Sequence, residues 1–142
     1  MLKIYVLLIC LCQCDCLKHM DLRLKDKVII ITGGSKGIGE AAVRAFAKEE
    51  SKVVIAGRSP NEGKSLAAET GGIFIEAELS EETSCNKVVE ETMTTYGQID
   101  VLINNAGYND GVDLEQPPKR FMSSLQANLS HVYTLTHLCR EQ

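Results

Sequence analysis

The glycine-rich segment at residues 32–39, Thr-Gly-Gly-Ser-Lys-Gly-Ile-Gly, has the residue types and spacing to bind a phosphate group. It directly follows a run of β-branched residues and precedes an amphipathic helical pattern, the context in which such glycines hold a pyrophosphate. Gly33 permits a tight turn, Gly37 lets backbone N–H groups approach the anion, and Gly39 allows a helix to pack closely on the strand. A flexible loop without a ligand is the alternative. The nucleotide contacts predicted in this segment are Gly33, Ser35, Lys36, Gly37, Ile38 and Gly39.

The end of the second apolar run indicates which dinucleotide would bind. An acidic residue at this point would accept hydrogen bonds from the ribose 2′-OH of NAD and repel a 2′-phosphate. The sequence at 56–59 is Ala-Gly-Arg-Ser, without a carboxylate. Arg58 and Ser59, together with Lys36, can hold a 2′-phosphate by charge-assisted hydrogen bonds. This pattern favours NADP over NAD, and a solvated surface Arg58 is the simpler alternative.

A second motif, Asn-Asn-Ala-Gly at 104–107, follows the fourth apolar run. Together with the glycine spacing of three residues and then one, it resembles the short-chain dehydrogenase/reductase family over residues 20–142. The resemblance implies that this stretch stabilises the cofactor pocket, with Asn105 tying the strand end to the first glycine turn. It also counts Ala106 as a cofactor contact and implies that Gly107 lets the ribose approach.

The same resemblance implies an adenine contact after the third apolar run, where such families usually have an aspartate. This sequence has Glu78 and Leu79 at the matching place, so the acidic side chain is longer by one methylene. We therefore expect Glu78 and Leu79 to lie beside the adenine.

Family members transfer hydride with a serine, a tyrosine that acts as general acid and base, and a lysine four residues after it that lowers the tyrosine pKa. No tyrosine of this sequence has a lysine at that distance, and the matching tyrosine would lie beyond Gln142. Asn128 matches the asparagine that holds a water in the proton relay of such enzymes. The alternative is a structural asparagine, because an unpartnered buried amide costs about 1–3 kcal/mol and Asn128 must then be hydrogen-bonded.

Residues 20–27, 108–112 and 124–129 resemble sugar-oxidising members of the family, L-fucose dehydrogenases in particular. The resemblance implies a full-length parent that is a homo-oligomer and oxidises a sugar, or another secondary alcohol, with NAD(P). Asn109 and Asp110 are suitably placed to meet a polyol. A non-catalytic nucleotide-binding or interaction module, which uses the exposed edge of the fourth strand and a face of the last helix to bind another chain, is the alternative.

These residues must be positioned by alternating strands and helices. Short apolar runs at 28–31, 53–56, 73–76 and 101–104 predict four strands separated by helical patterns, which is typical of βαβ units. We expect an α/β fold with a Rossmann-type doubly wound parallel sheet in the order 3-2-1-4, truncated because the later strands are missing. The helix from Gly37 is expected to bury Ile38, Ala42, Ala45 and Phe46, and another helix is expected from about 84 to 96.

Two further helices have recognisable ends or faces. The pattern Ser59-Pro60-Asn61-Glu62 predicts a capped helix start, and Gly71-Gly72 predicts its end. The last helix has an inward stripe of Phe121, Leu125, Asn128, Val132 and Leu135.

The composition fits one soluble globular domain, with 44% hydrophobic and 24% charged residues. A net charge of −4 and the lack of a basic cluster argue against nucleic-acid partners. Residues 1–19 form an apolar, cysteine-rich extension that is too short to span a membrane and lacks the spacing of a zinc site. This extension is a signal-like segment or a misassigned start, and residues 20–142 form the domain. A cytoplasmic location is expected because the cofactor must be supplied there; a secretory route is the alternative if the signal is real.

Overall fold

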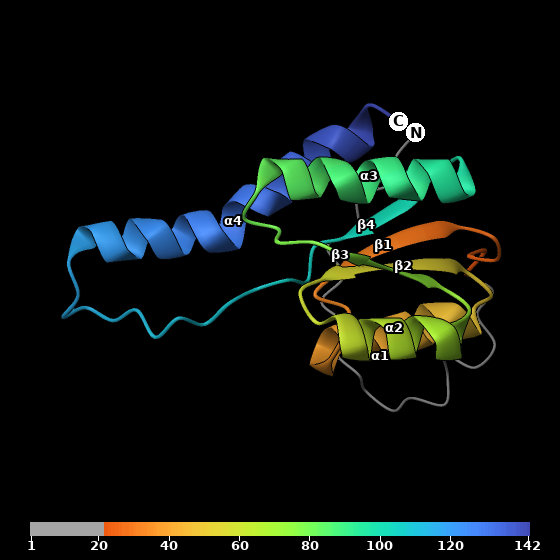
Figure 1. Cartoon of the computed structure of the whole chain (residues 1–142), viewed down its shortest axis with the longest axis horizontal. Helices are drawn as coiled ribbons and strands as arrows, with labels where there is room; N and C mark the ends of the chain where they lie inside the picture. The colour runs from red at the N-terminus through yellow and green to blue at the C-terminus, as the bar shows by residue number, and fades with distance from the viewer. Residues whose placement is uncertain (1–21) are drawn as a thin grey trace.

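The computed structural model describes residues 22–142 and contains a parallel sheet in the order β3-β2-β1-β4 (Figure 1). This confirms the predicted Rossmann-type strand order. The elements in chain order are β1 (Val28–Thr32), α1 (Gly37–Lys48), β2 (Lys52–Gly57), α2 (Pro60–Thr70), β3 (Ile73–Glu76), α3 (Glu82–Tyr96), β4 (Val101–Ile103) and α4 (Pro118–Arg140). The predicted extension at residues 1–19, with its cysteines, lies outside the described residues.

The sheet lies between two helical layers, α1 and α2 on one face and α3 and α4 on the other (Figure 1). Successive side chains of a strand point to opposite faces, so both halves of each strand pattern are buried. Ile30 of β1 packs in one apolar cluster with Leu135 of α4, and the neighbouring Ile29 packs in a second cluster with Val43 of α1. Burial on both faces explains why the strands are continuous apolar runs rather than alternating ones.

The inward face of α1 differs from the one predicted. Ile38 is 75% exposed and Ala45 is also exposed, whereas Ala42 and Val43 are buried and Phe46 is partly buried. The prediction was wrong for Ile38 and Ala45, which lie two turns apart on one side of α1, beside the stripe of Gly39, Ala42, Val43 and Phe46 that faces the sheet.

The ends of α2 are close to those predicted. Pro60 occupies the first turn and Gly71 ends the helix in the left-handed conformation, with φ +70°. Ser59 occupies the N-cap position, but its side chain makes no capping hydrogen bond. The Ser59 hydroxyl is therefore not used to cap α2.

The last helix, α4, has two different halves. Its C-terminal half buries His131, Leu135 and Cys139 at a spacing of four residues, against the sheet and α3. Its N-terminal half extends past the sheet, alongside the segment that follows β4 (Figure 1). Phe121, predicted to face inward, is 53% exposed because this half of the helix lies beyond the sheet. None of the helices in the described part of the chain has the length and apolar character needed to cross a membrane.

Candidate nucleotide-binding site

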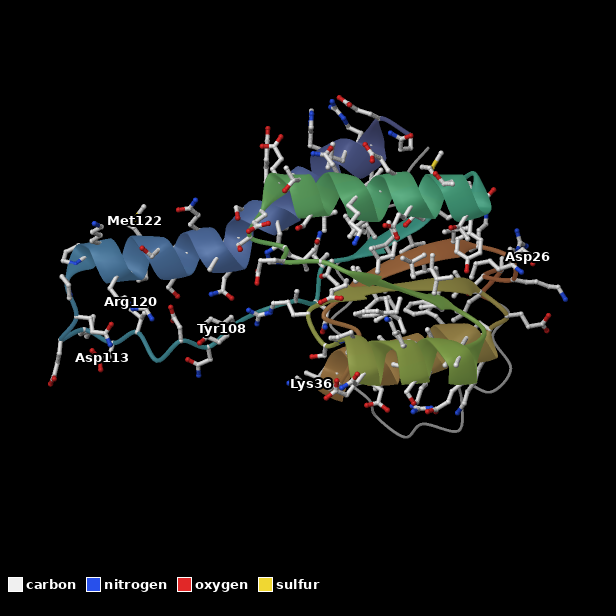
Figure 2. All side chains as sticks on the ribbon, viewed as in Figure 1. Asp26, Lys36, Tyr108, Asp113, Arg120 and Met122 are labelled. Atoms are coloured by element: carbon white, nitrogen blue, oxygen red, sulfur yellow. The ribbon has the colours of Figure 1, made fainter. Side chains whose placement is uncertain are left out.

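A cleft of about 530 Å³ lies at the carboxyl ends of the four strands. In open parallel sheets this edge is where ligands bind. Figure 2 shows Lys36, at the start of α1, and Tyr108, after β4, both on the left side of the sheet in this view. Of the residues predicted to bind a nucleotide, all but Gly37 line this cleft: Gly33, Ser35, Lys36, Ile38, Gly39, Arg58, Ser59, Glu78, Leu79, Asn105, Ala106 and Gly107.

The glycine turn between β1 and α1 requires two of its glycines for different reasons. Gly33 has a φ of +64°, which L side chains rarely adopt, and its N–H donates to the Ala56 carbonyl at 2.8 Å. A Cβ at Gly39 would overlap the Gly33 carbonyl oxygen, and Asn105 Nδ2 would lie only 2.6 Å from it. The absence of these side chains lets the first turn of α1 approach the strand end. Backbone N–H groups of this turn then lie beside the cleft, where an anion would be stabilised.

Thr32 and Asn105 hold the end of β4 against this turn. The Thr32 hydroxyl oxygen accepts hydrogen bonds from the N–H groups of Asn105, at 2.9 Å, and Ala106, at 3.0 Å. Asn105 Nδ2 donates to the carbonyls of Thr32, at 2.9 Å, and Gly33, at 3.2 Å. The arrangement is the one that the Asn-Asn-Ala-Gly motif implied for Asn105.

Arg58 lies at the mouth of the cleft between two groups. Its Nη1 is 3.5 Å from Glu78 Oε2, and its Cζ is 5.6 Å from the centre of the Tyr108 ring. Burial acts to raise the pKa of Glu78, but hydrogen bonds from Ser80 and the nearby Arg58 outweigh it, so this pKa is lowered. Glu78 is therefore an anion that competes for Arg58. The pair joins two strand ends, which the sequence pattern alone did not indicate.

Asn128 does not line the cleft, and its amide is fully engaged with backbone groups. Oδ1 accepts a hydrogen bond from the Tyr108 N–H at 2.6 Å, while Nδ2 donates to the carbonyls of Tyr108 and Ser124, each at 3.0 Å. These contacts fasten the chain after β4 to α4. They meet the requirement that a partly buried amide must have partners.

The polar residues after Tyr108 also bond to the protein. Asp110 Oδ2 lies 2.9 Å from Arg120 Nη1, and Asp110 Oδ1 accepts from the Ser124 hydroxyl at 2.9 Å. Asn109 Oδ1 accepts from the Gly111 N–H at 3.1 Å. The Asp110 carboxylate, which we expected to meet a polyol, is therefore occupied in fastening this segment to α4.

Several residues that line the cleft were not anticipated from the sequence. They are Gly57, Ala77, Ser80, Tyr108, Ala127 and His131. His131 is 2% exposed, and burial lowers its pKa, while hydrogen bonding to the backbones of Ala106 and Ala127 acts in the opposite direction. The spacing of three residues from Asn128 and four to Leu135 could have placed His131 on the inward face of α4.

The comparisons with known proteins identify the family of this chain. A family model described as short chain dehydrogenase matches residues 27–142. L-fucose dehydrogenase of Mus musculus is 37% identical over 119 residues, covering 82% of this chain and 44% of that protein. L-fucose dehydrogenase of Rattus norvegicus is 35% identical with the same coverage.

A relative of another kind, tropinone reductase-like 1 of Erythroxylum coca, is 39% identical over 94 residues, covering 65% of this chain and 35% of that protein. The chain spans less than half the length of these relatives. The family model covers nearly all of the described residues, and the chain belongs to the short-chain dehydrogenase family.

Proposed function

We propose that this chain forms the cofactor-binding part of an NADP-dependent oxidoreductase that oxidises a sugar or another secondary alcohol. The observation that carries the proposal is the cleft itself, which has a glycine turn and helix N-terminus along its wall and Arg58 at its mouth. The family generally binds NAD(P), and the name L-fucose dehydrogenase of two relatives supports a sugar as the substrate.

The residues of the cleft fit a dinucleotide. The Ser35 hydroxyl oxygen is buried and has no hydrogen-bond partner within residues 22–142, as expected of a group whose partner is a ligand. The N–H groups around Gly37 and Gly39 would hold the pyrophosphate, and Asn105, Ala106 and Gly107 would border a ribose. Bound NADP would supply the hydride acceptor, its nicotinamide ring.

The adenosine end of the cofactor would meet charged side chains. Arg58, Ser59 and Lys36 would hold the 2′-phosphate, and Glu78 and Leu79 would border the adenine. Arg58 must then exchange its contact with Glu78 for the phosphate. Because Arg58 is well exposed, its ion pair with Glu78 is weak, and breaking this pair costs little free energy.

For Asn128 we retain the proton-relay role in a protein that also has the serine, tyrosine and lysine of the family. Its amide is held by Tyr108 and Ser124, which supports a fixed placement of this part of α4. A homo-oligomeric whole protein in the cytoplasm belongs to the same proposal, with a secretory route as the alternative and NAD as the alternative cofactor.

Calorimetric titration of the 142-residue chain with NADPH and NADH tests the cofactor. We expect NADPH to bind more tightly. Arg58→Ala should weaken NADPH binding about 10-fold or more and leave NADH unchanged, because a charge-assisted hydrogen bond is lost only with the phosphate. Lys48→Ala, at the far end of α1, is the control. Equal binding of the two cofactors would contradict the choice of NADP, and binding of neither would contradict the proposal as a whole.

A non-catalytic interaction module is the second candidate, and one observation favours it. The N-terminal half of α4 exposes large apolar side chains that would suit contact with another polypeptide. They include Phe121, Met122 and Leu129. Light scattering on the wild-type chain and the Phe121→Ser/Met122→Ser variant tests this: self-association that the variant abolishes would favour the module.

A further inference from the structure

Among the described residues that line the cleft, Glu78 alone is acidic. Its carboxylate has a fixed orientation, because Oε1 accepts hydrogen bonds from the Ser80 hydroxyl at 3.0 Å and from the Ser80 N–H at 3.4 Å. Oε2 then faces Arg58, whose Nη1 lies 3.5 Å away. Since the pKa of Glu78 is lowered despite burial, the carboxyl is ionised at pH 7. The cleft therefore has a fixed negative charge beside the arginine that would hold a 2′-phosphate.

The register of the sheet brings Arg58 and Glu78 together. Gly57 of β2 lies opposite Glu76 of β3, and the Ala77 N–H donates to the Gly57 carbonyl at 3.0 Å. Arg58 and Glu78 each come directly after one of these hydrogen-bonded residues, so the two side chains leave neighbouring strand ends beside each other. A nucleotide that enters the cleft therefore meets Arg58 with Glu78 already next to it.

Arg58 has a second neighbour, Tyr108, whose ring centre is 5.6 Å from Cζ. A cation–π contact does not use the N–H donors of the guanidinium, so Tyr108 can stay in place while Arg58 donates to a phosphate. Glu78 cannot stay in the same way, because its carboxylate uses an N–H donor of Arg58 and has the same sign of charge as the phosphate. Salt screens charges only beyond about 8 Å, so two anions on one guanidinium repel each other.

We propose that Glu78 is a specificity-determining residue for the cofactor, because it competes with the 2′-phosphate for Arg58 and so narrows the preference for NADP over NAD. The inference rests on the proposed dinucleotide-binding function. NAD, which has no 2′-phosphate, leaves the pair of Arg58 and Glu78 intact, whereas NADP must break it. The penalty therefore falls on NADP alone, and removal of the Glu78 charge strengthens the preference for NADP.

Two probes that differ only in this phosphate, 2′-phospho-ADP-ribose and ADP-ribose, test the proposal by calorimetric titration of the 142-residue chain. We expect Glu78→Gln to raise the ratio of the two affinities about 2- to 5-fold in favour of the phosphorylated probe, the equivalent of one exposed ion pair. Glu81→Gln is the matched control, because it removes the same charge three residues away at a position that does not line the cleft. An unchanged ratio in folded Glu78→Gln, or an equal rise in Glu81→Gln, would overturn the role of Glu78.

The gain should depend on Arg58. In an Arg58→Ala background, Glu78→Gln should change the ratio less than half as much, and the full gain in that background would overturn the competition for Arg58. If Glu78→Gln does not fold, Glu78→Asp replaces it: the contact of 3.5 Å is at the limit of hydrogen-bond distance, so a side chain shorter by one methylene should also raise the ratio. Failure of the wild-type chain to bind both probes and NADPH would overturn the proposed function as well.

Discussion

The two segments that follow β1 and β4 differ from the arm formed by residues 108–130 in how they are held. The strand ends are joined by Thr32, which is fully buried, and by Asn105, which spans both segments. The arm is held by Asn128, which bonds to the backbones of Tyr108 and Ser124, and by the ion pair of Asp110 with Arg120. Figure 2 shows Arg120 on the side of α4 that faces the segment after β4 and Met122 on the opposite side.

This difference separates the part of the site that is fixed by the core from the part that is fixed only locally. Contacts to a buried strand can be lost only if the sheet itself opens, whereas contacts within the arm can open while the sheet stays folded. We therefore expect substitutions at the strand ends to lower the global free energy of unfolding, and substitutions in the arm to change local opening.

The largest effect is expected from Gly39→Ala. Its Cβ would overlap the Gly33 carbonyl, and neither backbone can shift without opening the β1–α1 turn, so we expect a loss of about 3 kcal/mol in unfolding free energy. Urea denaturation measures this loss. Gly97→Ala is the matched control, because Gly97 has a φ of +73° with open space around it and should lose only about 1 kcal/mol through backbone strain. Equal losses of unfolding free energy in the two variants would mean that the close approach of α1 to the end of β1 is not needed for stability.

Thr32→Val should have the next largest effect. It keeps the shape but removes the oxygen that accepts the Asn105 and Ala106 N–H groups, which costs about 2 kcal/mol when both are left unpaired. Thr92→Val is the control, since the buried Thr92 hydroxyl donates only to the Val88 carbonyl one turn earlier in α3. We expect the control to lose less than half as much in urea denaturation. A similar loss for Thr92→Val would mean that the hydrogen bonds of Thr32 to Asn105 and Ala106 contribute no more than an ordinary hydroxyl bond within a helix.

Acidic pH should lower the free energy of unfolding through His131, which is buried on α4 where the arm meets the core. Its pKa is lowered in the folded state, so the unfolded chain binds a proton first as the pH falls below the ordinary value of 6.5. Stability from neutral His131 is thus complete above that value and is lost as the pH falls towards the folded-state pKa. The carboxyl groups with lowered pKa values, Glu50, Glu78 and Asp100, titrate at lower pH.

Denaturation at pH 7.5 and at successively lower pH values measures this effect. His131→Leu should flatten the slope just below pH 6.5 and leave the lower carboxyl transitions in place. A wild-type slope in His131→Leu would show that the ring is not buried neutral.

The sequence predicted the fixed region better than the arm, for a physical reason. Strand order and the glycine turn follow from local apolar runs and from glycines whose neighbours in the chain define the turn. The inward positions of Ile38, Ala45 and Phe121 were predicted wrongly. Helical periodicity identifies an apolar stripe, but it fixes neither the exact side of α1 that faces the sheet nor how far the sheet extends beneath α4. The roles proposed for the cleft residues stay predictions until a nucleotide is bound.

Long-range polar pairs could not be predicted in the same way. Arg58 and Glu78 meet only because β2 and β3 are neighbours with a particular register, and this register is a property of the sheet. The sequence does not single out His131 as a cleft residue, because a lone histidine in a helical pattern belongs to no motif. Its burial depends on how α4 packs against the end of β4.

The smallest effect is expected from Asp110→Ala, which removes the contacts of the arm with Arg120 and Ser124. The Asp110 side chain is only 7% exposed, so the ion pair is partly shielded, and we expect a local loss of about 1 kcal/mol. Hydrogen exchange should rise at residues 108–117 while the strand amides and the urea midpoint stay unchanged. Asp113→Ala, in the same segment, is the control, because Asp113 Oδ1 only accepts from the nearby Glu115 N–H. A fall in the urea midpoint for Asp110→Ala would mean that the arm and the sheet unfold as one unit, and that the division into a core-fixed and a locally fixed region is wrong.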